Sequence, residues 1–535
     1  MKLENLSEKE LSALLAHLLR LDVDSDDIKE FSALICDRTH GNVFFVMKQL
    51  EELQDAHVLL FCPIKSKWKF SIEECRSKMN VTNNVAKLLS SRIGQLSRNS
   101  EQLLKLVSCF DSQVSPSLLE ATKEVLFIFD EVASALEEAC DEKLLIYIDS
   151  QDLYKMSHDE VHAAAYDLLP SGNERRMIHF DLGMAILKSL RKMPDDKLAL
   201  FACADQFTKA GVRMLRRTLR EKEILKVVNL FISTGKEAGL LFAHQPADDY
   251  IKTAADLLGA ERNEIFDDHN ELATKLFLLR AKTSLRANRI KECRECAESV
   301  ISHTHEQEHK RAAQLILIKS YSSDNLLGKQ ADYALPLLDS MGHGIVACTT
   351  MRKEKVMKQA FDLSDGELLA LPMISDKEVE FCIEITCELI QSAIHLAQTE
   401  FVCPALISLL SLTLEHGACR YTPLIFALIG QIIIAETKDL EKGLRFIELG
   451  LRSEYELDLE VKSRVLLHTC MGLGCIQPIS KCMYLALDGF ETGMSAGSIA
   501  TAFNASAWYL LSFFYSGMPI RSLLQDAEKF ILQME

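Results

Sequence analysis

The segment from Lys155 to Pro170, KMSHDEVHAAAYDLLP, holds the residues whose types and spacing best suit chemistry. His158 and Asp159 stand directly before apolar residues with helical spacing. This apolar face comprises Val161, Ala164, Ala165 and Leu168. At a helix N-terminus, Ser157 or Asp159 can cap free backbone N–H groups, and a histidine can donate to an anion that the helix dipole attracts. The residues alone favour a packed, hydrogen-bonded His–Asp pair over a phosphate ligand.

The same segment resembles the FxHDxVQxAAY signature that closes the winged-helix module of STAND-type AAA ATPases. These nucleotide-switched ATPases occur within multidomain signalling proteins, such as hybrid sensor histidine kinases and fused serine/threonine kinases. In that family the winged helix packs on the nucleotide site instead of on DNA. The resemblance implies that His158 senses the phosphates of a bound nucleotide.

A second candidate site lies in the turn from Thr39 to Phe45, THGNVFF. Gly41 and Asn42 suit a tight turn, and a plain helix-turn-helix explains them without further function. The stretch resembles the TxGNPFF turn in the helical lid of STAND ATPases, which implies that Gly41 and Asn42 contact nucleotide. Val43 stands where the family usually has proline near the adenine.

The composition indicates a large helical protein. The chain has 535 residues, 48% of them hydrophobic, with only 22 Gly and 11 Pro. Its formal net charge of −17 argues against a nucleic-acid partner, which needs a positive surface. The 16 cysteines show no framework and no secretory signal opens the chain, so we expect reduced thiols and a cytoplasmic location. The apolar stretch 401–435 is interrupted by polar residues and predicts buried helices, with no membrane span.

The elements that position the candidate sites are predicted to be almost all helices. The expected fold is mainly α: a helical lid plus a winged helix, followed by a superhelix of paired helices like tetratricopeptide (TPR) repeats, with only short β-hairpins. Residues 1–56 are assigned to the lid, 57–170 to a hairpin and winged helix, and 171–535 to degenerate, possibly truncated repeats. Ser7 and Glu10 form a capping pattern at the first helix, over 6–20. Helices are expected over 124–139 and 198–214, among others, and the wing at 144–148 and 153–154.

No catalytic motif accompanies these elements. The run Leu126–Glu131 has the form of a Walker B strand, but it continues one helical face, and the sequence contains no GxxxxGK[ST] loop. Kinase motifs are also absent from the sequence. We therefore expect that this chain is not an enzyme, and that the Walker segments lie upstream of Met1. ATP or ADP is the expected cofactor only where that core is present, and no metal site is expected.

Three further patterns favour structural interpretations. Cys293 and Cys296 form a CxxC inside a helical run, where neither redox chemistry nor zinc binding is favoured. His303, His305 and His309 are expected in a solvated turn. The clearest basic cluster is expected on a solvated helix face, with an acidic-partner site as the alternative. That cluster comprises Arg213, Arg216, Arg217, Arg220 and Lys222.

The family resemblance continues through the repeats, at 174–183, 350–373 and 490–517 among other places. It implies a regulatory or sensor segment of a signal-transduction ATPase or kinase that closes over nucleotide and relays ligand or partner binding. A protein or peptide is the expected partner on the superhelix, with kinase modules in the parent chain. The alternative is a standalone repeat scaffold that does not depend on nucleotide, and a DNA-binding winged helix is disfavoured. A Walker A loop in frame upstream would separate the first two hypotheses.

Overall fold

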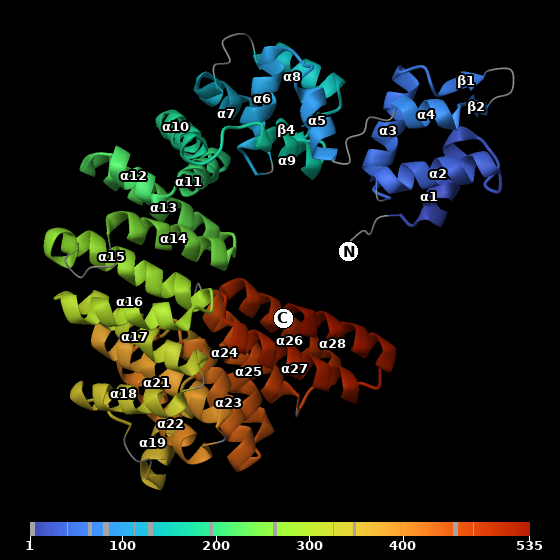
Figure 1. Cartoon of the computed structure of the whole chain (residues 1–535). Coiled ribbons are helices and arrows are strands. Elements are labelled where there is room, and N and C mark those ends of the chain that lie inside the picture. Colours follow the sequence, from blue (N-terminus) through green and yellow to red (C-terminus); the bar gives the residue numbers. More distant parts are fainter. Residues whose placement is uncertain are drawn as a thin grey trace. The chain divides into compact units, whose positions relative to one another are not determined.

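The computed structural model (Figure 1) is mostly helical along its length. It divides into two compact units, Met1–Met214 and Leu215–Glu535. The described residues are 6–39, 41–62, 67–78, 85–111, 113–126, 132–191, 196–259, 265–324, 326–345, 349–396, 398–452, 458–474 and 476–534. Within them the chain is mainly α, with two short antiparallel hairpins, as predicted.

The first unit opens with a group of helices that share one core. The elements are α1 (Glu8–Leu19), α2 (Asp26–Thr39), α3 (Val43–Asp55), β1 (Leu60–Cys62), β2 (Lys67–Lys69) and α4 (Ile72–Lys78). The capping pattern at α1 is confirmed, because the Ser7 hydroxyl accepts from the Glu10 N–H while the Glu10 carboxylate accepts from the Ser7 N–H at 2.9 Å. Leu11 and Leu15 of α1 are fully buried, and Trp68 of β2 packs on the same core.

The next part of the first unit contains helices and a two-stranded hairpin at the position predicted for the wing. Its elements are α5 (Val85–Ile93), α6 (Arg98–Ser108), α7 (Pro116–Thr122), a 3₁₀ turn (Lys123–Leu126), α8 (Val132–Asp141), β3 (Leu145–Ile148), β4 (Leu153–Met156) and α9 (Asp159–Asp167). The wing strands pair with Leu145 opposite Met156. A continuous helix was expected over 124–139, and the 3₁₀ turn departs from it. Most of the Walker B-like run, 127–131, lies outside the described residues.

Two further helices, α10 (Asn173–Leu190) and α11 (Lys197–Ala210), also belong to the first unit. A buried hydrogen-bond chain joins them to α9 and α6. Tyr166 contacts the His179 ring at 2.9 Å, and His179 contacts the Gln206 amide oxygen at 2.7 Å. The Gln206 amide donates to the Cys109 carbonyl at 2.9 Å. Burial lowers the pKa of His179, which favours a neutral ring in this chain of bonds.

The second unit is a succession of helices in which neighbours along the chain pack together, as in αα repeats. A helix predicted over 198–214 instead ends at Ala210, and α12 (Val212–Thr218) begins after it. Gly211 causes the break, because its φ of +87° is outside the helical region and favours glycine. The remaining helices are α13 (Glu221–Leu240), α14 (His244–Leu258), α15 (Ile265–Arg286), α16 (Ile290–His303), α17 (Gln307–Ser323), α18 (Leu327–Ser340), α19 (Thr350–Asp362), α20 (Asp365–Leu369), α21 (Lys377–His395), α22 (Thr399–His416), α23 (Thr422–Thr437), α24 (Leu440–Arg452), α25 (Leu459–Leu473), α26 (Ile479–Ala496), α27 (Ile499–Tyr515) and α28 (Ile520–Met534).

The apolar stretch 401–435 forms α22 and α23, which contribute to an extended apolar core of this unit. Across the described part of the chain, no helix combines the length and apolar character needed to cross a membrane. Helices α23 and α24 approach very closely, because Gly430 and Gly443 face each other. A Cβ atom added at Gly430 would lie 2.6 Å from the Gly443 carbonyl oxygen.

Candidate functional site

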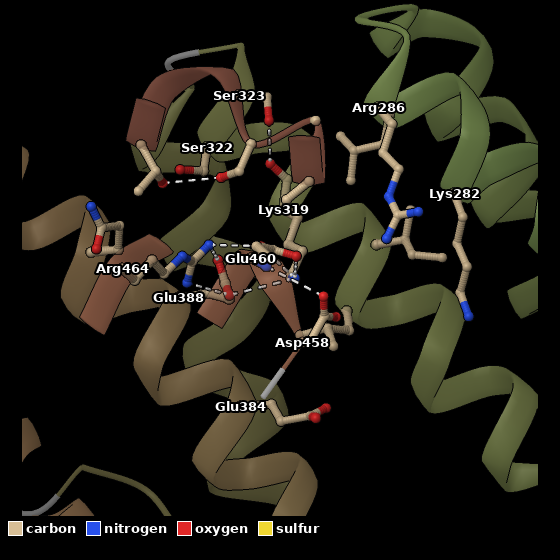
Figure 2. Close-up of a pocket in the computed structure, with 18 of the residues that line it drawn as sticks. Lys282, Arg286, Lys319, Ser322, Ser323, Glu384, Glu388, Asp458, Glu460 and Arg464 are labelled. Atoms are coloured by element: carbon tan, nitrogen blue, oxygen red, sulfur yellow. Dashed lines mark hydrogen bonds and ion pairs between the residues drawn. The ribbon is translucent and has the colours of Figure 1, made fainter. Parts of the chain in front are cut away.

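The candidate site is a cavity of about 1090 Å³ inside the second unit (Figure 2). Its walls come mainly from α15, α17, α21, the start of α25 and the turn between α26 and α27. Helical spacing brings one face of α17 into the cavity through Arg311, Leu315, Lys319 and Ser322. The cavity therefore collects side chains that are far apart in sequence.

The turn at Gly497 bounds this cavity by contacting helices from the start of the unit. Gly497 has a φ of +71°, and a Cβ atom there would lie 3.1 Å from both the Arg286 Cβ and the His244 Nε2. A side chain at this position would thus strain the backbone and crowd two neighbours. Burial, with the nearby Arg286 charge, lowers the pKa of His244 and favours its neutral form at this contact.

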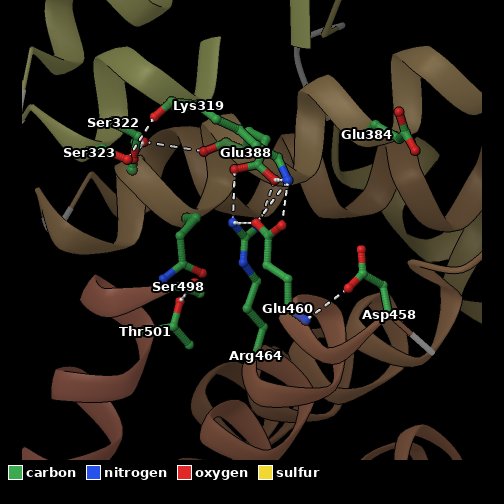
Figure 3. A network of polar contacts seen from close by, with 12 residues as sticks. Lys319, Ser322, Ser323, Glu384, Glu388, Asp458, Glu460, Arg464, Ser498 and Thr501 are labelled. Carbon is green, nitrogen blue, oxygen red and sulfur yellow. Dashed lines mark hydrogen bonds and ion pairs between the residues drawn. The ribbon is translucent and has the colours of Figure 1, made fainter. Parts of the chain in front are cut away.

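Four charged side chains from three helices form a network on the cavity wall (Figure 3). Arg464 of α25 pairs with both carboxylate oxygens of Glu388 of α21, at 2.7 and 3.0 Å. It also pairs with Glu460 at 2.9 Å. Lys319 of α17 lies 2.8 Å from both oxygens of Glu460 and 3.8 Å from Glu388. The two cations thus compensate the two carboxylates and connect α17, α21 and α25.

The network lies largely out of water. The side chains of Glu388 and Arg464 are only 2% and 7% exposed. Charges at such depth are tolerated only where they are paired and hydrogen-bonded. Burial by itself would raise the pKa of Glu460, but Lys319 and Arg464 outweigh it and lower the pKa to about 2. At Glu384, burial instead outweighs the partner Arg420 and raises the pKa.

The pKa of Glu460 predicts acid sensitivity of the second unit. The pKa of Glu460 in the folded protein lies below its usual value of 4.5. The ionised carboxylate therefore stabilises the fold fully above pH 4.5, and this stabilisation is lost as the pH falls toward 2. We expect the thermal unfolding midpoint to fall between roughly pH 5 and pH 3, and to fall less steeply in Glu460→Gln. Replacing the exposed Glu295 by Gln should leave the wild-type pH dependence. Equal slopes for wild type and Glu460→Gln in calorimetry would contradict this assignment.

The predicted nucleotide contacts lie at two turns of the first unit. Gly41 has a φ of +75°, and its carbonyl accepts from the Leu6 N–H at 2.9 Å. The carbonyl of Asn42 accepts from the Val46 N–H at 3.0 Å at the start of α3. His158 is the N-cap residue of α9, which confirms the predicted helix N-terminus. Its own Nδ1 accepts from the Glu160 N–H at 3.2 Å, so the expectation of a cap from Ser157 or Asp159 was wrong. Nucleotide contact by Gly41, Asn42 and His158 stays a prediction.

The other sequence patterns have local environments that the structure describes. Cys293 and Cys296 are buried in α16, and burial raises their pKa values to about 12 and about 11, so both thiols stay protonated. His303 bonds the Ser299 carbonyl at 2.8 Å. In the ranges that the structure describes, no group of three or more His, Cys, Asp or Glu could hold a metal. In the basic cluster, Arg216 donates to the Leu257 carbonyl at 3.2 Å.

The cavity network was not predicted from the sequence. A signal for it is present in α21, where Glu380, Glu384, Glu388 and Gln391 recur with helical spacing in a helix that is rich in buried residues. Such a polar row facing a core needs buried partners. The partners lie in other repeats, so the sequence pattern could indicate the row but not the residues that neutralise it.

Comparisons with known proteins give distant similarities. The chain matches no protein-family model. It is 18% identical over 610 residues to hybrid signal transduction histidine kinase G of Dictyostelium discoideum, which covers 99% of this chain. The chain spans 18% of the length of that relative. Among solved structures, a Signal Transduction ATPase with Numerous Domains (STAND) protein with a tetratricopeptide repeat sensor, from Pyrococcus horikoshii, matches with a TM-score of 0.34 and 12% identity, covering 99% of this chain and 66% of that one. A circular tandem repeat protein matches with a TM-score of 0.16 and 12% identity, covering 98% and 96%.

Proposed function

We propose that this chain is a non-catalytic sensor and regulatory segment of a nucleotide-switched signal-transduction ATPase or kinase. The observation that carries the proposal is the cavity of about 1090 Å³ in the helical array, with charged side chains on its wall. Pockets of this size accommodate small molecules. The sequence similarity to a signalling histidine kinase over 99% of the chain supports the regulatory context.

In this proposal the two units have different tasks. The cavity of the second unit receives a ligand or partner group, and the charge network holds α17, α21 and α25 in the receptive arrangement. The first unit closes over ATP or ADP bound by an ATPase core of the parent protein, with His158, Gly41 and Asn42 as nucleotide contacts. The ligand binds one of the two states of the nucleotide switch more tightly than the other, and binding therefore shifts the equilibrium toward that state.

Substitution of His158 in the parent protein tests the nucleotide part. His158→Ala removes both the imidazole and the N-cap, whereas His158→Asn keeps a good N-cap and removes only the imidazole. If the imidazole contacts phosphate, both variants should release ADP faster, by about tenfold, as expected for the loss of one charge-assisted hydrogen bond.

The two variants separate function from structure. If His158 only caps α9, His158→Ala should destabilise the first unit by about 1 kcal/mol while His158→Asn stays near wild type. ADP retention that is unchanged in His158→Asn would refute the sensor role. If the parent binds no nucleotide at all, the standalone scaffold becomes the better interpretation.

A further inference from the structure

Two cations in the cavity, Lys282 and Arg286, differ from the others in forming no ion pair with a residue that the structure describes. Both line the cavity from the last turns of α15. Among the described residues, neither side chain has an ion pair or a hydrogen bond, whereas every other cation of the cavity wall is paired. Those pairs are Arg311–Glu378, Lys319–Glu460, Lys377–Glu380, Arg420–Glu384 and Arg464–Glu388. The positive charges without an ion pair therefore lie on the wall that α15 forms.

The two side chains are placed to act on the same ligand. They are four residues apart, so they lie on one face of α15. Figure 2 shows Arg286 extending from the α15 wall toward Lys319 and Asp458, with Lys282 farther along the same wall. The hydroxyl-bearing turn with Ser498 and Thr501 forms part of the same lining.

The electrostatics of this wall favour an added negative charge. Solvent reaches the Lys282 side chain, yet burial by the surrounding walls lowers its pKa, and nearby cations lower it further. These cations are Arg286, Arg420 and Lys319, and the smaller effect of the Asp458 carboxylate, which raises the pKa, does not offset them. Like charges gathered in a recess repel one another, and an anion among them removes that repulsion.

We propose that the cavity binds a small multivalent anion, with phosphate or carboxylate groups, through Lys282 and Arg286. The proposal rests on the proposed function, because it names the ligand of the same cavity. A small molecule fits better than a folded partner, because the contact of Gly497 with Arg286 and His244 bounds the space. An anion held between α15 and the turn at Ser498 would also link two segments that are far apart in the sequence. Binding would therefore stabilise the packing of these two segments against each other.

Isothermal titration calorimetry on the whole 535-residue chain tests this site, with sodium pyrophosphate and sodium citrate as separate probes. We expect binding of at least one probe, and the stronger of the two identifies phosphate or carboxylate as the preferred group. The double variant Lys282→Gln/Arg286→Gln should weaken binding about tenfold or more, since both charge-assisted contacts are lost.

A matched control removes two cations elsewhere. Lys355→Gln/Arg521→Gln makes the same charge change at exposed positions of the second unit, outside the cavity lining, and should bind like wild type. Binding of neither probe, or an equal loss in the control, would overturn the proposal. Circular dichroism confirms that each variant folds. If the double variant does not fold, Lys282→Gln alone should still lower affinity severalfold, and unchanged affinity would overturn the site.

Failure of this proposal can be told apart from failure of the sensor function. The sensor function predicts that filling the cavity changes nucleotide retention in the parent protein, whatever the charge of the ligand. If filling the cavity has that effect but neither anion binds, the ligand class is wrong and the sensor function stands.

Discussion

Replacing Arg464 by Met should lower the free energy of unfolding of the second unit by about 3 to 5 kcal/mol. Glu388 is only 2% exposed and would lose the guanidinium that contacts both its oxygens. Lys319 stays 3.8 Å away from Glu388 and compensates part of the charge, which places the effect toward the lower end of this range. The measurement is calorimetric unfolding, followed for the transition of the second unit.

Two controls show whether the cost comes from the uncompensated carboxylate. The double variant Arg464→Met/Glu388→Met removes both buried charges and should recover most of the lost stability. Arg452 is 60% exposed and pairs with Glu448 at 3.1 Å, so Arg452→Met should cost less than about 1 kcal/mol. A double variant no more stable than Arg464→Met would show that packing, and not charge, sets the cost.

Replacing Gly430 by Ala should destabilise the second unit by about 1 to 3 kcal/mol, although alanine is the better helix former. The added methyl group would lie 2.6 Å from the Gly443 carbonyl oxygen and 2.9 Å from the Ile447 backbone nitrogen. Because these are backbone atoms, α23 and α24 must move apart to admit it. Calorimetric unfolding of the second unit again measures the effect.

Gly239 provides the matched control for this substitution. It is also helical, in α13, and a Cβ atom there would meet nothing within 4 Å. Gly239→Ala should therefore leave stability unchanged or raise it by about 0.4 to 1 kcal/mol. If Gly430→Ala were as stable as Gly239→Ala, the close approach of α23 and α24 would not limit side-chain size.

The sequence predicted those elements that short-range patterns determine. The capping box at Ser7 and Glu10, the β3–β4 wing and the helix start at His158 all follow from residues within a few positions of one another. The break at Gly211 shows where a local pattern misled, because the apolar spacing of 198–214 suggested one helix. The helix ends there because Gly211 adopts a positive φ, and the spacing of the apolar residues does not indicate this.

The cavity could not be predicted in the same way, because its residues meet only in the folded array. Lys319 and Glu460 are 141 positions apart, and their pairing depends on the path of every helix between them. Gly497 likewise contacts Arg286 only because the helices between them bring the turn after α26 next to α15. Without a repeat register, the sequence could place these residues on helices but could not bring them together.

The most direct test is to fill the cavity and measure ADP retention in the parent protein. Ala312 of α17 lines the cavity, and Ala312→Trp would occupy it, whereas Ala507→Trp adds the same side chain at an exposed position of α27. If ligand binding in the cavity controls the nucleotide switch, Ala312→Trp should change the ADP dissociation rate by about fivefold or more. The Ala507→Trp variant should keep the wild-type rate. Equal rates for both variants and wild type, with both folded, would contradict the sensor function.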